Sequence, residues 1–160
     1  MSSGGRERTD YWTARGRDWP SVRQFNVFLE NRVGMLLELV RKFEVANNRI
    51  VALSVDDSVD YAIIRLVLRD PDRARETFNL ANIPYIESDL LVVQLPPDPH
   101  PLVDICKALL QAEINIHYAY PLMLAPERPA LALHVDNHET AVAILRQQGF
   151  TILTEADLGD

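Results

Sequence analysis

The chain has 160 residues, of which 48% are hydrophobic and 24% charged, a composition typical of a globular protein. Its net charge is −7, spread unevenly: residues 1–23 carry five Arg against three acids, or +2, which leaves −9 for the remainder. An acidic body suits a phosphate backbone poorly, and no apolar run reaches the roughly 18 residues of a membrane span, so we expect neither nucleic-acid nor membrane binding.

The chain begins with residues 1–22, which are rich in Gly, Arg and Ser and show no clean periodicity. We expect a loosely held extension whose tryptophans, Trp12 and Trp19, dock on this chain or on a partner, because Trp is unusual in a disordered tail. No apolar segment follows its charges, so we do not expect a signal peptide. A single cysteine excludes an intrachain disulfide and, with the absent signal, predicts a reducing, cytoplasmic location.

Residues 23–88 alternate between strand and helix patterns. Leu36, Leu39, Val40 and Phe43 recur at the spacing i, i+3, i+4, i+7 of an amphipathic helix. Asp70-Pro71 is typical of a second helix start, with Asp as the cap and Pro at the first helical position. The predicted elements are strand 24–29, helix 34–46, strand 49–55, strand 61–69, a helix from residue 71, and one or two extended segments within 83–95.

The same pattern returns in residues 89–160 at an offset of 66, where core positions match and surface identities do not. The fold class is therefore predicted to be α+β: two tandem ferredoxin-like βαββαβ units, with antiparallel sheets and helices on one face. Units of about 65 residues are marginal alone, so we expect each to complete the other's core. The repeated helix positions of the second unit are Leu102, Ile105, Cys106, Leu109 and Ala112.

The segment LENRVGML, residues 29–36, places a polar corner and a glycine before the first helix. A helix N-terminus offers free N–H groups and a partial positive charge, which suit a carboxylate. Gly34 permits a tight turn and a close ligand approach, and the Asn31 amide can meet an ammonium group. The residue types alone also fit a simple turn, in which Asn31 caps and Gly34 supplies left-handed backbone, and such turns are common.

LENRVGML, followed by a helix, by NNRIVALSV and by a hairpin, resembles the ACT-domain family, and LLQAEINIHYAY looks like the same family's helix-to-strand join. The resemblance covers residues 24 to about 156. It implies a non-catalytic regulatory module without a cofactor, which binds a small molecule, usually an amino acid, between two such domains. It also implies partners: a biosynthetic enzyme, or a second copy in a homodimer. The acetolactate synthase regulatory-subunit type is one member that the chain resembles in size.

The second corner, LPPDPHPL, differs from the first, since Pro97, His100 and Pro101 stand where the first has Asn31, Gly34 and Met35. Proline has no N–H to donate. The family's asparagine at the start of the second strand is Arg49 in the first unit and Asn115 in the second. We therefore predict one composite ligand site, with an apolar surround that favours a branched-chain or other apolar amino acid. Its predicted residues are Leu29, Asn31, Val33, Gly34, Met35, Leu36, Asn115 and, as a pocket-lining residue or a packing residue, His117.

Other chemistry is weakly indicated. Four histidines show no ligand spacing, so no metal site is expected. Cys106 is predicted to lie in the apolar stripe of a helix, where a thiol is inert, and no catalytic residue is assigned. Residues 122–124 (LML) are either packed or a contact patch. The alternative function is a partner-docking subunit of a biosynthetic enzyme, such as acetolactate synthase, with the Trp-bearing extension as its dock.

Overall fold

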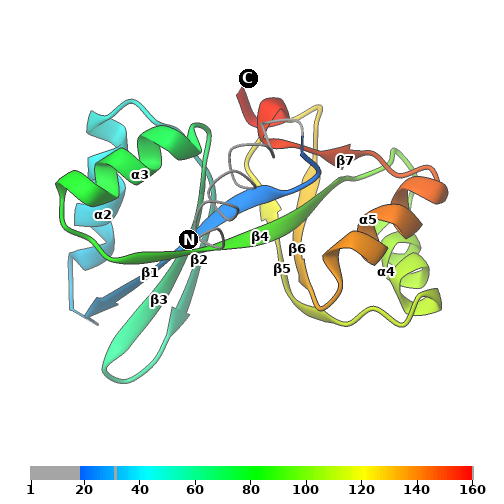
Figure 1. Cartoon of the computed structure of the whole chain (residues 1–160), viewed down its shortest axis with the longest axis horizontal. Helices are drawn as coiled ribbons and strands as arrows, with labels where there is room; N and C mark the ends of the chain where they lie inside the picture. The colour runs from blue at the N-terminus through cyan, green and yellow to red at the C-terminus, as the bar shows by residue number, and fades with distance from the viewer. Residues whose placement is uncertain (1–18, 31, 160) are drawn as a thin grey trace, which may run out of the picture.

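The structure is a computed structural model that describes residues 19–30 and 32–159. Its elements follow the βαββαβ order twice, with one strand shared, which confirms the predicted fold class (Figure 1). The elements are β1 (Val22–Glu30), α2 (Met35–Val45), β2 (Ile50–Asp57), β3 (Tyr61–Leu68), α3 (Pro71–Leu80), β4 (Tyr85–Gln94), α4 (Pro101–Gln111), β5 (Ile116–Leu122), β6 (Ala130–Val135), α5 (His138–Gln147), β7 (Ile152–Leu153) and the 3₁₀ helix η1 (Glu155–Gly159).

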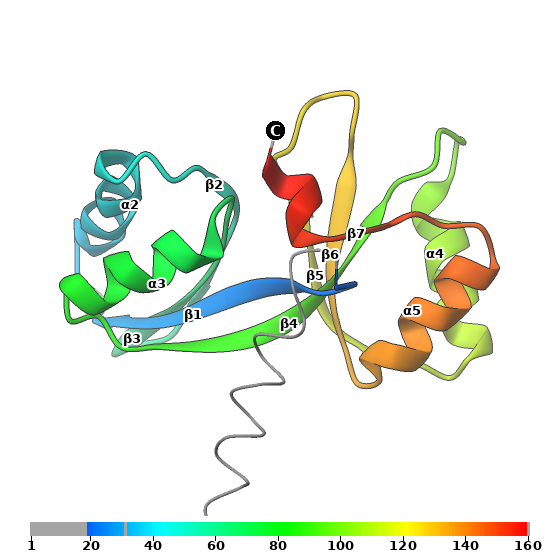
Figure 2. The same cartoon turned by 45° about the horizontal axis from the view of Figure 1, so that its top comes forward.

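One seven-stranded antiparallel sheet runs through both units in the order β2-β3-β1-β4-β6-β5, with β7 also beside β4. The first part of β4 pairs with β1, with Val27 opposite Tyr85, and the last part pairs with β6 and β7. Strand β4 is thus the last strand of the first unit and the first strand of the second, and crosses between them (Figure 2). The boundary expected between residues 88 and 89 falls inside this strand.

Local sequence explains where the helices begin. The backbone N–H of Arg73 donates to the Asp70 side chain at 3.2 Å, and Pro71 is the first residue of α3, as predicted. In the second unit the N–H of Thr140 donates to the Asn137 side chain at 3.2 Å and so caps α5. An Asx side chain at this position satisfies a helix N–H that no carbonyl reaches.

Three apolar clusters hold the sheet. Two lie under the helices, one in each unit, and are centred on Phe78 and on Leu145. The third joins the units on the helix-free side of the sheet and confirms that each completes the other's core. The sheet curls until β2 meets β5, where the N–H of Met123 donates to the Val51 carbonyl at 2.6 Å. Buried members of the third cluster include Val51, Ala52 and Val67 from the first unit and Leu122, Ala130 and Ala132 from the second.

Cys106 and the segment of residues 122–124 differ in how they are buried. Cys106 is exposed and does not lie in the buried stripe of α4, which is a correction: Ile105, Ala108 and Leu109 form that stripe. In the LML segment, Leu122 is buried in the third cluster while the Met123 side chain is 53% exposed. Among the described helices, none has the length and apolar character needed to span a bilayer.

Candidate functional site

The predicted ligand loop forms the corner between β1 and α2. Gly34 has φ 88° and ψ −10°, a left-handed conformation that glycine adopts without strain. No atom of the described residues lies within 4 Å of where its Cβ would stand, and Val33 is fully exposed. No side chain of the described residues caps α2. The Met35 N–H donates to the Arg32 carbonyl at 3.3 Å, and among the described residues no side chain competes for the other N–H groups of this turn, an arrangement that suits a carboxylate.

The apolar residues of this corner divide into two groups. Leu29 and Leu36 pack against the helix-side core of the first unit, so they support the corner from within. Met35 is half-buried, and its sulfur lies 3.2 Å from Arg32 Nη2. Asn31 lies outside the described residues, so its predicted contact with a ligand stays a prediction.

The matching corner of the second unit has different chemistry. His100 precedes α4 with φ −135° and ψ 60°, an ordinary conformation with no left-handed turn, and makes no side-chain cap. Pro101 occupies the first helical position, so one of the N–H groups available at α2 is missing here. The contrast between the two corners that the sequence predicted is present in the backbone itself.

Asn115 lies just before β5, and its backbone exchanges two hydrogen bonds of 3.2 Å with Asp136. Its side chain is exposed. His117 is exposed as well, with its ring 5.5 Å from that of His134. Both residues remain available to a ligand that arrives from outside this chain.

A single chain does not bring the two halves of the predicted site together. Val27 lies opposite Tyr85, so Glu30 lies beyond the start of β4. On the other side, Leu133 pairs with Leu91, and Ile116 pairs with Val135, which places Ile116 level with residue 89 of β4. At about 3.3 Å per residue the corner and Asn115 are roughly 20 Å apart along the strand direction. One chain therefore does not form the predicted composite site by itself, because its own Asn115 does not face this corner; a site formed between two copies stays a prediction.

Sequence reasoning missed a polar network on the helix-free side, where the two units meet. Gln24 is fully buried; its Nε2 donates to Tyr118 OH at 2.7 Å and to Asn26 Oδ1 at 2.9 Å. The Tyr120 hydroxyl donates to Gln24 Oε1 at 2.5 Å. Burial, together with the neighbouring Tyr118, raises the pKa of Tyr120 well above its ordinary value. The sequence feature that could have indicated this network is the pair Tyr118 and Tyr120, at positions i and i+2 of one predicted strand.

A bulge in β5 places the side chains of Ile116 and Tyr118 on opposite faces of the sheet. The register shifts between Ile116 and Tyr118, so Ile116 packs with the helix-side core while Tyr118 faces the third cluster. An uninterrupted strand would have placed both side chains on one face.

The described residues contain no group of three or more His, Cys, Asp or Glu side chains that could hold a metal ion.

A sequence model described as an ACT domain pair matches residues 20–160. No curated protein matches the sequence.

Several solved structures are similar in fold. Protein BT0572 from Bacteroides thetaiotaomicron has a TM-score of 0.79 at 23% identity, over 88% of this chain and 96% of that one. The ligand-free regulatory subunit of aspartate kinase from Thermus thermophilus has a TM-score of 0.55 at 12% identity, over 81% and 93%. The regulatory subunit of aspartate kinase from Thermus flavus has a TM-score of 0.51 at 13% identity, over 79% and 92%. At these identities the likeness shows the fold.

Proposed function

The chain belongs to the ACT domain pair family, a class of regulatory ligand-binding modules, and on that premise we propose that it binds an amino acid between two copies of itself. The observation that carries the proposal is the β1–α2 corner, where a left-handed Gly34 opens the uncapped N-terminus of α2. The amino acid's carboxylate would lie on the N–H groups of Gly34, Met35 and Leu36, replacing the 3.3 Å bond from Met35 to the Arg32 carbonyl, with its amine toward Asn31.

The second half of the proposed site comes from another copy of the chain. Asn115 and His117 are exposed and lie far along the sheet from the corner of their own chain. A symmetric dimer in which the corner of one chain meets Asn115 of its partner copy would hold two equivalent ligands. Such a ligand would stabilise the dimer by its preference for the closed arrangement over the open one. We retain an apolar, branched-chain amino acid as the expected class, because Val33 and Met35 flank the corner.

The test is a thermal-shift panel of the twenty amino acids on the full chain, with sedimentation to follow association. A sharp rise in melting temperature with one or a few amino acids supports the proposal, since stabilisation follows RT ln(1 + [L]/Kd). Gly34→Val should abolish the response, because a β-branched residue disfavours φ near +88° and would block the N–H groups. Asn115→Ala should raise the Kd for the amino acid about tenfold and so reduce the rise in melting temperature. Gly149→Val, at the same backbone angle but away from the corner, is the matched control.

A second candidate function is that of an enzyme-docking regulatory subunit. The observation that favours it is an open groove of about 570 Å³ between α2 and α3, flanked by the exposed side chains Val45 and Leu80. Two proteins of similar fold are regulatory subunits of aspartate kinase. We propose that a biosynthetic enzyme would bind here, with the extension at residues 1–22 as a further contact.

Affinity capture from the native host separates the two functions. Recovery of a biosynthetic enzyme that is lost with Leu80→Glu, or on deleting residues 1–18, which spares the buried Val22 of β1, together with a flat amino-acid panel, would favour docking. A clear amino-acid response that Leu80→Glu leaves unchanged would favour the sensor.

A further inference from the structure

Arg65, on the helix-free face of β3, is a largely buried cation without a hydrogen-bond partner among the described residues. Its side chain is 17% exposed, and its Nε is buried and unpartnered. The nearest carboxylate oxygen, Asp56 Oδ2, lies 3.7 Å from Nη1, which is beyond hydrogen-bond distance. A guanidinium carries five donors in a fixed plane, so a large binding capacity is unused.

Two other arginines, the buried Arg23 and the partly exposed Arg75, both form ion pairs at hydrogen-bond distance. Arg23, whose side chain is 6% exposed, pairs with Asp89 and with Glu87. Arg75 forms a two-pronged pair with Glu87, through bonds of 2.9 and 2.8 Å. Burying a charged group without hydrogen bonds costs free energy, and Arg65 alone of these three bears that cost. An external anion would relieve it.

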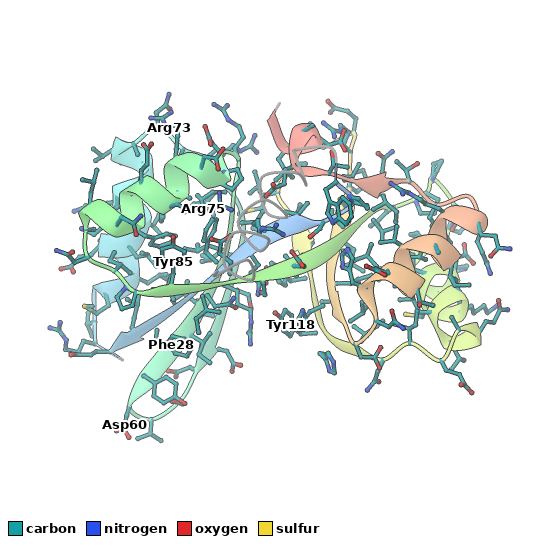
Figure 3. The ribbon with its side chains drawn as sticks, in the orientation of Figure 1. Phe28, Asp60, Arg73, Arg75, Tyr85 and Tyr118 are labelled. Carbon is teal, nitrogen blue, oxygen red and sulfur yellow. The ribbon has the colours of Figure 1, made fainter. Side chains whose placement is uncertain are left out.

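The guanidinium of Arg65 is already held in place. It lies over the ring of Tyr118, 4.2 Å from the centroid, and that ring in turn stacks on His134 at 4.9 Å. Gln24 fixes the Tyr118 hydroxyl. Among the described residues, Nδ1 of His134 is a second buried atom without a hydrogen-bond partner. Figure 3 shows Tyr118 in the space between the two units. A rigid cation stacked on an aromatic ring needs little reorganisation to bind an anion.

The surface beside Arg65 is mixed: Asn26 and Ser54 lie opposite Arg65 and Asp56 lies opposite Ile63, while the part of the face further from Arg65 is apolar and exposed. Ile63 and Tyr61 precede Arg65 on the same face of β3, and Phe28 lies opposite Ile63 on β1. Phe28 and Tyr61 are each 48% exposed, and their rings are 6.4 Å apart. Figure 3 places Phe28 on the side of the sheet away from α2 and α3. An apolar group can therefore lie against this face while its charged end reaches toward Arg65.

We propose that this face binds a small amphipathic oxyanion, a carboxylate or a phosphate ester that carries an aromatic or branched apolar group. Because Nε is buried, two anion oxygens would accept from Nη1 and Nη2 of Arg65, whose paired N–H groups match carboxylate and phosphate geometry, in competition with Asp56 at Nη1. The apolar group would lie on Phe28 and Tyr61. This site is separate from the amino-acid site, because it uses no N–H of α2 and requires no ammonium group.

The experiment is calorimetric titration of the full chain with phenylacetate, phenyl phosphate, acetate and inorganic phosphate. We expect saturable binding of the two phenyl compounds, and the tighter of them identifies the carboxylate or the phosphate as the preferred anion. Arg65→Gln should weaken that binding at least tenfold. Arg146→Gln, an exposed arginine of α5, should leave it unchanged. Absence of saturable binding by all four probes at millimolar concentration, or equal binding by Arg65→Gln, overturns the proposal.

Two further measurements separate this role from a structural one. Arg65→Lys keeps the charge but loses the planar fork, so it should fold and bind more weakly than the native chain yet better than Arg65→Gln. Without any probe, Arg65→Gln should match or exceed the native melting temperature, because it removes an unsatisfied buried charge. A clear fall would assign Arg65 to folding and overturn the proposal. Gly34→Val should leave phenyl-compound binding intact, which keeps this test independent of the amino-acid site.

Discussion

The two ACT units are alike beneath their helices and differ on the helix-free face. Phe43 and Phe78 of the first unit and Leu109 and Leu145 of the second all fill buried helix-side positions. On the other face, Ala52 pairs with Val67 and Ser54 with Arg65, whereas the equivalent pairs of the second unit are Tyr118 with His134 and Tyr120 with Ala132.

This difference makes the units complementary rather than interchangeable. The second unit supplies large rings where the first has small side chains, and the first supplies Gln24 and Arg65, which contact those rings. A symmetric pair of first units would leave Arg65 without a ring, and a symmetric pair of second units would crowd the tyrosines. Divergence on this face therefore makes each unit the structural complement of the other.

The largest effects should come from the shared body. Phe78→Ala removes a ring that stacks on Tyr85 at 4.8 Å and lies 5.2 Å from Phe43, and should lower the free energy of unfolding by about 3–5 kcal/mol. Leu145→Ala, its counterpart, should cost about 2–5 kcal/mol. Because β4 belongs to both units, urea unfolding followed by fluorescence and by circular dichroism should give one coincident transition. Two separated transitions would show that the units unfold independently.

A smaller loss is expected at the junction of the units. Gln24→Ala leaves the buried Tyr120 hydroxyl without its acceptor and Tyr118 without its donor, and should lower the free energy of unfolding by about 2–3 kcal/mol. The control is Gln111→Ala, since Gln111 is exposed and, among the described residues, its side chain accepts one hydrogen bond, from Gln148 Nε2 at 3.1 Å; it should change stability by less than about 0.5 kcal/mol. Equal effects of the two substitutions would contradict a structural role for the network.

The same junction should give the protein an alkaline pH dependence. Burial raises the pKa of Tyr120 in the folded chain, so the folded state keeps this proton to higher pH than the unfolded state does. Its stabilising effect is complete below the ordinary tyrosine pKa of about 10 and declines as pH rises above it, by up to about 1.4 kcal/mol per pH unit. Unfolding measured between pH 8 and pH 11 should show a shallower decline for Tyr120→Phe. Identical slopes would refute this assignment.

The smallest predicted effect tests whether equivalent helix caps contribute equally. Asp70→Ala and Asn137→Ala each remove a cap bond of 3.2 Å to the third helical residue. Each should lower the free energy of unfolding by about 1 kcal/mol. Urea midpoints of the two variants should fall together, and a difference of more than about 1 kcal/mol would mean that one helix depends on its cap far more than the other.

Sequence reasoning succeeded where the signal is local. The spacing of Leu39 and Phe43 and the Asp70-Pro71 start predicted helices that the structure contains. At the candidate site, the contrast between Gly34 and Pro101 was predictable because each residue imposes its own backbone constraint. The distance between Gly34 and Asn115 was not predictable, since it depends on how β4 pairs with two other strands.

By itself the sequence determined the two βαββαβ repeats, the Asp70 helix cap and the unequal corners, because periodicity, capping and backbone freedom are properties of neighbouring residues. Only the tertiary structure decided that the units share β4, that Tyr118 turns toward Arg65, and that Arg65 is buried without a hydrogen-bonding counterion. Those features depend on strand register and on a bulge, which arise from contacts between residues far apart in the chain.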